Sequence, residues 1–215
     1  MKPRRLFIAG STGAVGSTLL KVAARHALDV VPHVRPKSAA TVDHPAKCVL
    51  ELTDPALARS LEGCTTVVQL IGTMRKRFAS GDTYESSDIG TTRSLVEAAK
   101  QAGIDHLVLL SSTGAGRPFG AYLKAKAAAE ALVRQSGIPF TIIRPSAFED
   151  REGVFVPGLR TLTTALGLDS YRPIKVLELA SAIAKVATDR APLDAVLEGK
   201  TLWTVVEAAA SLRRE

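Results

Sequence analysis

Two groups of residues near the middle of the chain carry side chains that could move a proton. Ser111 and Ser112 follow an apolar run, and Tyr122 and Lys126 come after a loop rich in glycine and proline. Because residues four apart lie on one face of a helix, the phenol and the ammonium are expected to be neighbours. The ammonium would stabilise a phenolate, and a serine hydroxyl could hydrogen-bond a substrate oxygen. The spacing predicts proton transfer to or from a carbonyl or hydroxyl group, although a tyrosine and a lysine four apart also occur together by chance.

A third group, Gly10, Gly13 and Gly16, could bind a phosphate. Glycines permit a tight turn, close approach of the backbone to an anion, and close packing of the following helix on the strand. The helix N-terminus adds free N–H groups and the positive end of the helix dipole. The spacing G-x-x-G-x-x-G differs from the usual dinucleotide fingerprint G-x-G-x-x-G. A tight turn from strand to helix without a ligand is therefore the alternative.

Arg35 follows a predicted strand at 29–34, where an NAD-selective protein commonly places an acidic residue. A guanidinium matches a phosphate with two parallel hydrogen bonds, and Lys37 lies close by in the sequence. The cationic pair favours NADP(H), through its 2′-phosphate, and leaves NAD(H) possible. An exposed arginine with no ligand is the alternative.

Apolar runs alternate with helical patterns along the first two thirds of the chain. Runs rich in valine, isoleucine and leucine predict strands at 6–9, 29–34, 48–52, 66–71, 107–111 and 140–143. Helices are predicted at 15–25, 55–61, 91–102 and 122–136, and glycines close three of them. This alternation predicts an α/β fold: a Rossmann-type, doubly wound parallel sheet in three α/β/α layers, with ligands at the carboxyl ends of the strands.

The regular pattern loosens after Pro145. We expect a loop, a weak helix near 159–166, a helix at 177–188 and a last strand around 202–206. No linker interrupts the 215 residues, so a single domain is predicted, with a cofactor-binding core at 1–145 and a substrate-side segment at 146–215.

The composition weighs against several classes of function. The formal net charge is +7, but the lysines and arginines are scattered and no aromatic residues interleave with them, which argues against nucleic acid. The first apolar run is too short for a signal peptide or a membrane span. Cys48, Cys64 and four isolated histidines fit no metal motif, and two buried thiols are typical of the reducing cytoplasm, where we expect the protein.

Four stretches of the chain together resemble a known family. They are GSTGAVG at 10–16, SSTGAG at 111–116, YLKAK at 122–126 and AAAEALVRQSGIPFTIIRPSAF at 127–148. They are similar to the atypical short-chain dehydrogenase/reductases, in particular to small NAD(P)H-binding members related to the Tat-interacting oxidoreductase and to nucleoside-diphosphate-sugar epimerase-like proteins. The likeness extends over most of residues 4–148.

The resemblance implies a catalytic triad of Ser112, Tyr122 and Lys126, with Ser112 preferred to Ser111 because it directly precedes the loop. It also implies that Lys126 holds the nicotinamide ribose, that Arg35 meets the adenosine phosphate and that Pro145 borders the nicotinamide. The full set of cofactor-binding residues expected in this way is Gly10, Ser11, Thr12, Gly13, Ala14, Val15, Gly16, Arg35, Leu52, Ile71, Gly72, Thr73, Ser111, Tyr122, Lys126 and Pro145.

The chain departs from the family pattern at two places. After the third strand the family usually has an aspartate that touches the adenine, whereas this chain has Glu51 and Leu52, with Asp54 later. Many relatives carry an asparagine for a proton relay where this chain reads SSDIG at 86–90, so the relay is expected to be altered or absent. The 70 residues after Pro145 also argue against a large nucleotide-sugar domain.

The function favoured by these residues is an NADP-dependent oxidoreductase that transfers hydride to or from a small carbonyl or alcohol, with Tyr122 as general acid or base. A redox-sensing NADPH-binding protein without catalysis is one alternative, and an epimerase-like activity on a nucleotide sugar is another. The expected partner is a small-molecule substrate. The alanine-rich faces of 91–102 and 122–136 could pair in a homodimer or pack within one chain.

Overall fold

A computed structural model describes residues 4–72, 83–150 and 158–213. Within these ranges seven strands form one parallel sheet in the order β3-β2-β1-β4-β5-β6-β7. The strands are β1 Arg5–Ala9, β2 Asp29–Val34, β3 Cys48–Val49, β4 Thr66–Gln69, β5 His106–Leu110, β6 Phe140–Arg144 and β7 Ala195–Glu198. The order reverses between β1 and β4, which places the ligand-binding crevice of such a sheet at their carboxyl ends. The predicted Rossmann-type doubly wound fold is confirmed.

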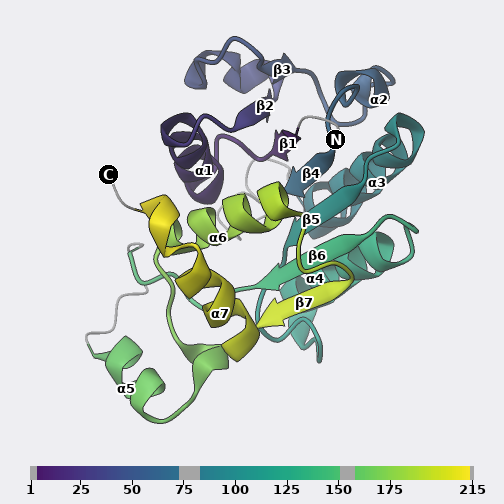
Figure 1. The fold of residues 1–215 in the computed structure, drawn as a ribbon. Helices are drawn as coiled ribbons and strands as arrows, with labels where there is room; N and C mark the ends of the chain where they lie inside the picture. The colour runs from purple at the N-terminus through teal and green to yellow at the C-terminus, as the bar shows by residue number, and fades with distance from the viewer. Residues whose placement is uncertain (1–3, 73–82, 151–157, 214–215) are drawn as a thin grey trace.

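Helices cover both faces of the sheet (Figure 1). On one face lie α1 Ala14–Arg25, α6 Val176–Asp189 and α7 Lys200–Ala208, and on the other lie α2 Leu57–Ser60, α3 Thr91–Ala102 and α4 Gly120–Arg134. Two separate apolar clusters result, one on each side of the sheet, and strands such as β1 contribute alternate residues to both. This burial on two faces explains why the strands are almost continuously hydrophobic.

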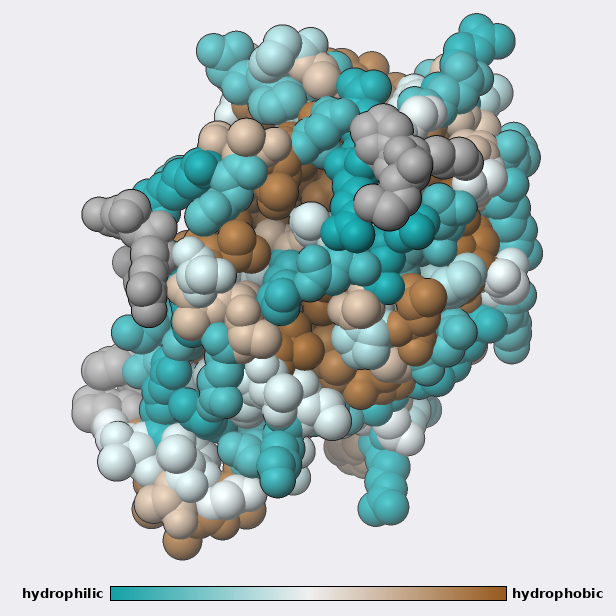
Figure 2. Space-filling model, in the orientation of Figure 1, coloured by the Kyte–Doolittle hydropathy of each residue, from teal (hydrophilic) through white to brown (hydrophobic). Residues whose placement is uncertain are grey.

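The remaining elements of the described ranges are short. These are η1 Pro36–Thr41, the π-helical segment η3 Glu85–Gly90, α5 Leu159–Ala165, η4 Asp169–Tyr171 and η5 Ala210–Arg213. The α5 segment projects from the sheet at the lower left of Figure 1, and Figure 2 shows apolar side chains at its tip. Leu162 in α5 and Leu166 just after it are both exposed.

The expected last strand at 202–206 is wrong, because these residues lie in α7. Their apolar and β-branched side chains favour a strand locally, yet Leu202, Trp203 and Val206 recur at helical spacing and are buried in the cluster that contains α6. The seventh strand is instead the short stretch Ala195–Glu198, which pairs with β6 at the sheet edge. Of the other expected elements, the third strand is two residues long and α4 begins at Gly120.

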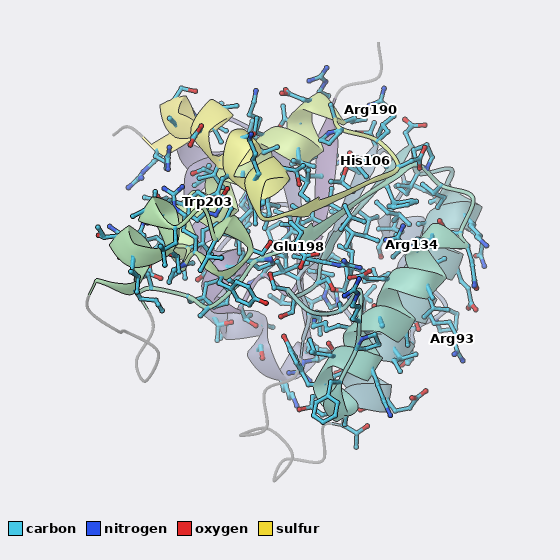
Figure 3. The ribbon with its side chains drawn as sticks, turned by 90° about the horizontal axis from the view of Figure 1, so that it is seen from below. Arg93, His106, Arg134, Arg190, Glu198 and Trp203 are labelled. Carbon is cyan, nitrogen blue, oxygen red and sulfur yellow. The ribbon has the colours of Figure 1, made fainter. Side chains whose placement is uncertain are left out.

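A buried histidine in β5 predicts how the free energy of unfolding depends on pH. His106 is fully buried, and its Nε2 lies 2.9 Å from the Thr141 hydroxyl oxygen, which donates its own proton to the Pro192 carbonyl. The Nε2 nitrogen must then be the donor, and Nδ1, which has no hydrogen-bond partner among the described residues, would receive any further proton in the core. Burial, assisted by nearby Arg190 (Figure 3), lowers the pKa of His106 to about 4.

Because the unfolded chain binds a proton at His106 near pH 6.5 and the folded chain does not, the free energy of unfolding should fall as the pH drops from about 6.5 to 4. This single site should contribute roughly 3 kcal/mol of that loss. Denaturant unfolding at pH 7 and pH 4.5 measures this loss of unfolding free energy. The variant His106→Gln should lose less stability over this interval than the parent, and equal losses in the two proteins would contradict the assignment.

Candidate functional site

The glycine loop between β1 and α1 forms a backbone cradle. Gly10 has a φ of +94°, a conformation that favours glycine, and its carbonyl accepts a hydrogen bond from the Gly13 N–H at 3.0 Å. A Cβ on Gly16 would lie 2.1 Å from the Gly10 carbonyl oxygen, so this position has no room for a side chain. The loop therefore closes tightly on the helix, and the first N–H groups of α1, which begins at Ala14, form the end of the cradle.

A cavity of about 260 Å³ opens in front of this loop at the carboxyl ends of β1, β2 and β4. The side chains around it come from the glycine loop, the chain after β2 and β3, the end of β4, and the junction of η3 with α3. The lining residues are Gly10, Thr12, Gly13, His33, Val34, Arg35, Glu51, Leu52, Thr53, Leu70, Ile71, Gly72, Ser86, Ser87 and Thr91.

Seven of the residues expected from the sequence line this cavity, namely Gly10, Thr12, Gly13, Arg35, Leu52, Ile71 and Gly72. Ser11, Val15 and Gly16 are buried and support the cradle from behind; the Ser11 hydroxyl donates to the Ile8 carbonyl at 2.8 Å. Ala14 is exposed at the start of α1, and Pro145 follows β6, away from this lining. Thr73 lies outside the described residues.

Several lining residues were not predicted from the sequence, among them His33, Glu51, Ser86 and Ser87. His33 is buried at the end of β2, and its Nε2 lies 2.9 Å from the Leu50 carbonyl oxygen. Burial is the main cause that lowers the pKa of His33, while the bond to Leu50 and the charge of Glu51 act in the opposite direction. The ring is thus a neutral donor to Leu50 at neutral pH, and it fixes the chain after β3 against β2. A histidine in an otherwise apolar strand was the available signal.

The predicted proton-transfer residues lie next to this cavity at the start of α4. Tyr122 and Lys126 share one face of the helix, and the Lys126 Nζ lies 6.0 Å from the centre of the Tyr122 ring. Tyr122 is 38% exposed, whereas Lys126 is buried. Ser112 is half-buried, and its hydroxyl donates to the Thr113 carbonyl at 3.4 Å. The structure therefore places the ammonium beside the Tyr122 ring and leaves that ring partly exposed.

Gly72 connects the two halves of the site. It lines the cavity, and a Cβ built on it would lie 2.7 Å from the Lys126 Nζ. The ammonium thus occupies the space that a side chain at position 72 would fill. The absence of a side chain here lets the lysine reach the edge of the cavity.

Ser111 belongs to a buried polar network behind the site. It is buried, and its hydroxyl donates to Glu130 Oε1 at 2.6 Å. Arg144 donates to both oxygens of Glu130, at 2.8 and 2.6 Å, and to Glu198 at 2.9 Å. Glu198 lies near the middle of Figure 3, at the end of β7. Hydrogen bonds to Glu130 and Glu198 hold the pKa of Arg144 above its ordinary value. This network joins α4 to β5, β6 and β7, so Ser111 supports the site and Ser112 is the serine nearer to solvent.

The segment 86–90 contains a further residue that sequence reasoning missed. Its lack of asparagine led to the expectation of an altered or absent relay, but Asp88 is buried there and its Oδ1 lies 2.9 Å from the Lys126 Nζ. The ion pair joins η3 to α4. The only signal in the sequence that could have indicated this ion pair was the acidic residue within the short run SSDIG.

Comparison with known proteins identifies the type of fold and ligand. The model of a family described as NAD(P)H-binding matches residues 10–190, which include the glycine loop, Tyr122 and Lys126. The chain belongs to the NAD(P)H-binding family. Membership confirms the resemblance at this level, and a nicotinamide cofactor is the ligand that the cradle and cavity of an NAD(P)H-binding protein are built to hold.

One relative of this NAD(P)H-binding protein is the mitochondrial protein FMP52 of Debaryomyces hansenii, which is 34% identical over 148 residues. The match covers 66% of this chain and 65% of that protein, so the chain spans just under two thirds of the relative's length. Among solved structures, a putative NAD-dependent epimerase/dehydratase from Bacillus halodurans has a TM-score of 0.73 at 21% identity, covering 95% of this chain and 99% of that one.

A second solved structure is the NADPH-dependent quinone oxidoreductase of Escherichia coli in complex with NADPH. Its TM-score is 0.68 at 18% identity, and the match covers 90% of this chain and 68% of that chain. At these identities the two structures establish the fold of the NAD(P)H-binding chain. In the part of the chain that the structure describes, no helix is both long and apolar enough to cross a membrane, and no cluster of histidine, cysteine and acidic residues could hold a metal ion.

Proposed function

We propose that this protein is an NADP(H)-dependent oxidoreductase that transfers hydride to or from a small carbonyl or alcohol, with Tyr122 as general acid or base. One observation carries the proposal: the Tyr122 and Lys126 pair adjoins the cofactor cavity through Gly72, which lines the cavity and packs against the lysine ammonium. A proton-transfer pair and a nicotinamide site at one sheet edge are the two parts that carbonyl reduction requires.

The residues present fit the cofactor. The glycine cradle and the N-terminus of α1 would hold the pyrophosphate, Leu52 the adenine, Arg35 the 2′-phosphate, and Gly72 the space beside a ribose. A bound nicotinamide supplies or accepts the hydride at the substrate carbon. Ile71 lines the cavity, and Pro145 would border the nicotinamide, as the family resemblance implies.

The chain's own part in the reaction is the proton. During reduction the Tyr122 hydroxyl gives its proton to the substrate oxygen, and during oxidation the phenolate takes it back. Lys126, 6.0 Å from the ring, stabilises the phenolate by its positive charge. The Ser112 hydroxyl, next to the end of β5, is the donor that would hold the substrate oxygen in place.

Turnover with NADPH tests the proposal directly. We expect the purified protein to oxidise NADPH in the presence of at least one member of a panel of aldehydes, ketones and quinones. Absence of turnover together with NADPH-dependent binding of a partner protein would favour the redox-sensing alternative. Tight binding of a nucleotide sugar would favour an epimerase-like activity. We also propose that the protein is cytoplasmic and that it forms a homodimer through α3 and α4.

The proposed cofactor preference depends on Arg35. Replacing it with alanine removes the guanidinium from the cavity wall and should weaken NADPH binding by at least about tenfold, because a charge-assisted phosphate contact is lost. Binding of NADH, which lacks the 2′-phosphate, should change little. Fluorescence titration of both cofactors measures the ratio of the two dissociation constants. Arg59→Ala, an exposed arginine on α2 outside the cavity lining, removes the same charge and should leave the ratio unchanged.

A further inference from the structure

The π-helical segment η3 packs along the face of α4 that carries the proton-transfer residues. Tyr84, just before η3, lies with its ring centre 5.9 Å from that of Tyr122, at an angle of 57° between the rings. Asp88, four residues later, contacts Lys126. Tyr122 and Lys126 are also four apart, so two matched pairs meet across the two helices. Single π-helical turns recur at functional sites, where they place side chains that an α-helix would direct elsewhere.

Hydrogen bonds hold Asp88 in place from behind. The Thr92 hydroxyl donates to the Asp88 carbonyl at 2.6 Å and accepts from the Gln69 side-chain amide at 3.2 Å. The other end of the Gln69 amide accepts the Ile71 N–H at 2.9 Å. Gln69 and Thr92 are both buried. A continuous series of hydrogen bonds thus joins the cavity wall at Ile71 to the backbone carbonyl of Asp88, the residue whose carboxylate contacts Lys126.

The position of the ammonium is set by three neighbours. The Lys126 Nζ lies 2.9 Å from Asp88 Oδ1 and 3.5 Å from the Leu110 carbonyl oxygen, and it fills the space over Gly72. The side chains of Lys126 and Asp88 are only 7% and 1% exposed. A buried charge is stable only when it is paired, so loss of the carboxylate would leave the ammonium free to turn toward solvent or toward Leu110.

From this juxtaposition we infer that Asp88 is a positioning residue: it holds Lys126 at the nicotinamide end of the cavity, ready to meet the cofactor ribose and Tyr122. The inference rests on the proposed function only for the effect on turnover. The effect on cofactor binding follows from the placement of Lys126 over Gly72 and can be measured without a substrate.

Asp88→Ala in the 215-residue chain tests the inference. A misplaced ammonium should raise the dissociation constant for NADPH by about threefold or more and lower kcat by about tenfold, while KM for the carbonyl substrate changes little. Asp88→Asn removes the paired charge but keeps an oxygen within reach of the ammonium, so both losses should be smaller than in Asp88→Ala. Asp189→Ala removes the carboxylate of an exposed pair with Lys185 and serves as the matched control.

A double-mutant cycle separates positioning from general destabilisation. In a Lys126→Met background, Asp88→Ala should have no further effect on NADPH affinity, since its effect acts through the lysine. Unchanged NADPH affinity in a folded Asp88→Ala protein, equal losses in the alanine and asparagine variants, or full additivity with Lys126→Met would each overturn the inference. If the wild-type protein turns over no carbonyl, the proposed function fails, and the binding measurements still decide the role of Asp88.

Discussion

Replacing Tyr122 with phenylalanine should lower kcat for carbonyl reduction by about a thousandfold, the range expected when a positioned general acid is removed. The ring is retained, so its packing against Tyr84 and its place beside Lys126 should persist. The dissociation constant for NADPH should therefore change by less than about threefold, since the cavity lining does not include the phenol. Stopped-flow or steady-state NADPH oxidation and a fluorescence titration measure the two quantities.

The chain offers a matched control for this variant. Of its three tyrosines, Tyr171 lies in η4 and is 67% exposed, so Tyr171→Phe removes one hydroxyl without touching α4. This control should keep the parent kcat. Turnover by Tyr122→Phe at the parent rate would mean that another group, or water, donates the proton, and the proposed mechanism would be wrong. Loss of NADPH binding in the same variant would point to a role in the cofactor site instead.

The core of the fold was predictable because local pattern and tertiary environment agree there. β2 and α3 have the predicted bounds: the strand is apolar on both faces and the helix ends at Gly103, which has a φ of +65°. The stretch 202–206 failed because its intrinsic strand preference opposes its environment. Packing of Trp203 and its neighbours in the α6 cluster outweighs that preference.

The candidate site was predictable where residues close together in the sequence determine the local geometry. Glycines in a tight loop and a tyrosine and a lysine four apart on a helix need no information from distant parts of the chain. Asp88 and Glu130 could not be assigned in this way, since each acquires its partner only when separate elements pack: η3 against α4, and α4 against β6. A charged residue in an amphipathic pattern is usually a surface residue, and only the fold shows that these two are buried.

The largest effect on stability should come from Glu130, whose carboxylate is the centre of the network behind the site. It is 3% exposed and accepts hydrogen bonds from Ser111 and, through two nitrogens, from Arg144. Glu130→Ala would leave the guanidinium with Glu198 as its remaining partner and the Ser111 hydroxyl without an acceptor. Removing one member of a buried pair costs about 3 to 5 kcal/mol, so the free energy of unfolding should fall by about that amount.

Denaturant unfolding of the parent, Glu97→Ala, Glu130→Ala, Arg144→Ala and the double variant distinguishes the loss of the buried pair from the loss of a helix side chain in general. Glu97→Ala, at an exposed position of α3, should change the free energy of unfolding by less than about 0.5 kcal/mol. Glu130→Ala combined with Arg144→Ala should lose less than the sum of the single changes, by about 1 to 3 kcal/mol, because the second change removes the stranded charge. Strict additivity would contradict this account, since it would mean that the two side chains contribute independently although the structure joins them by two hydrogen bonds.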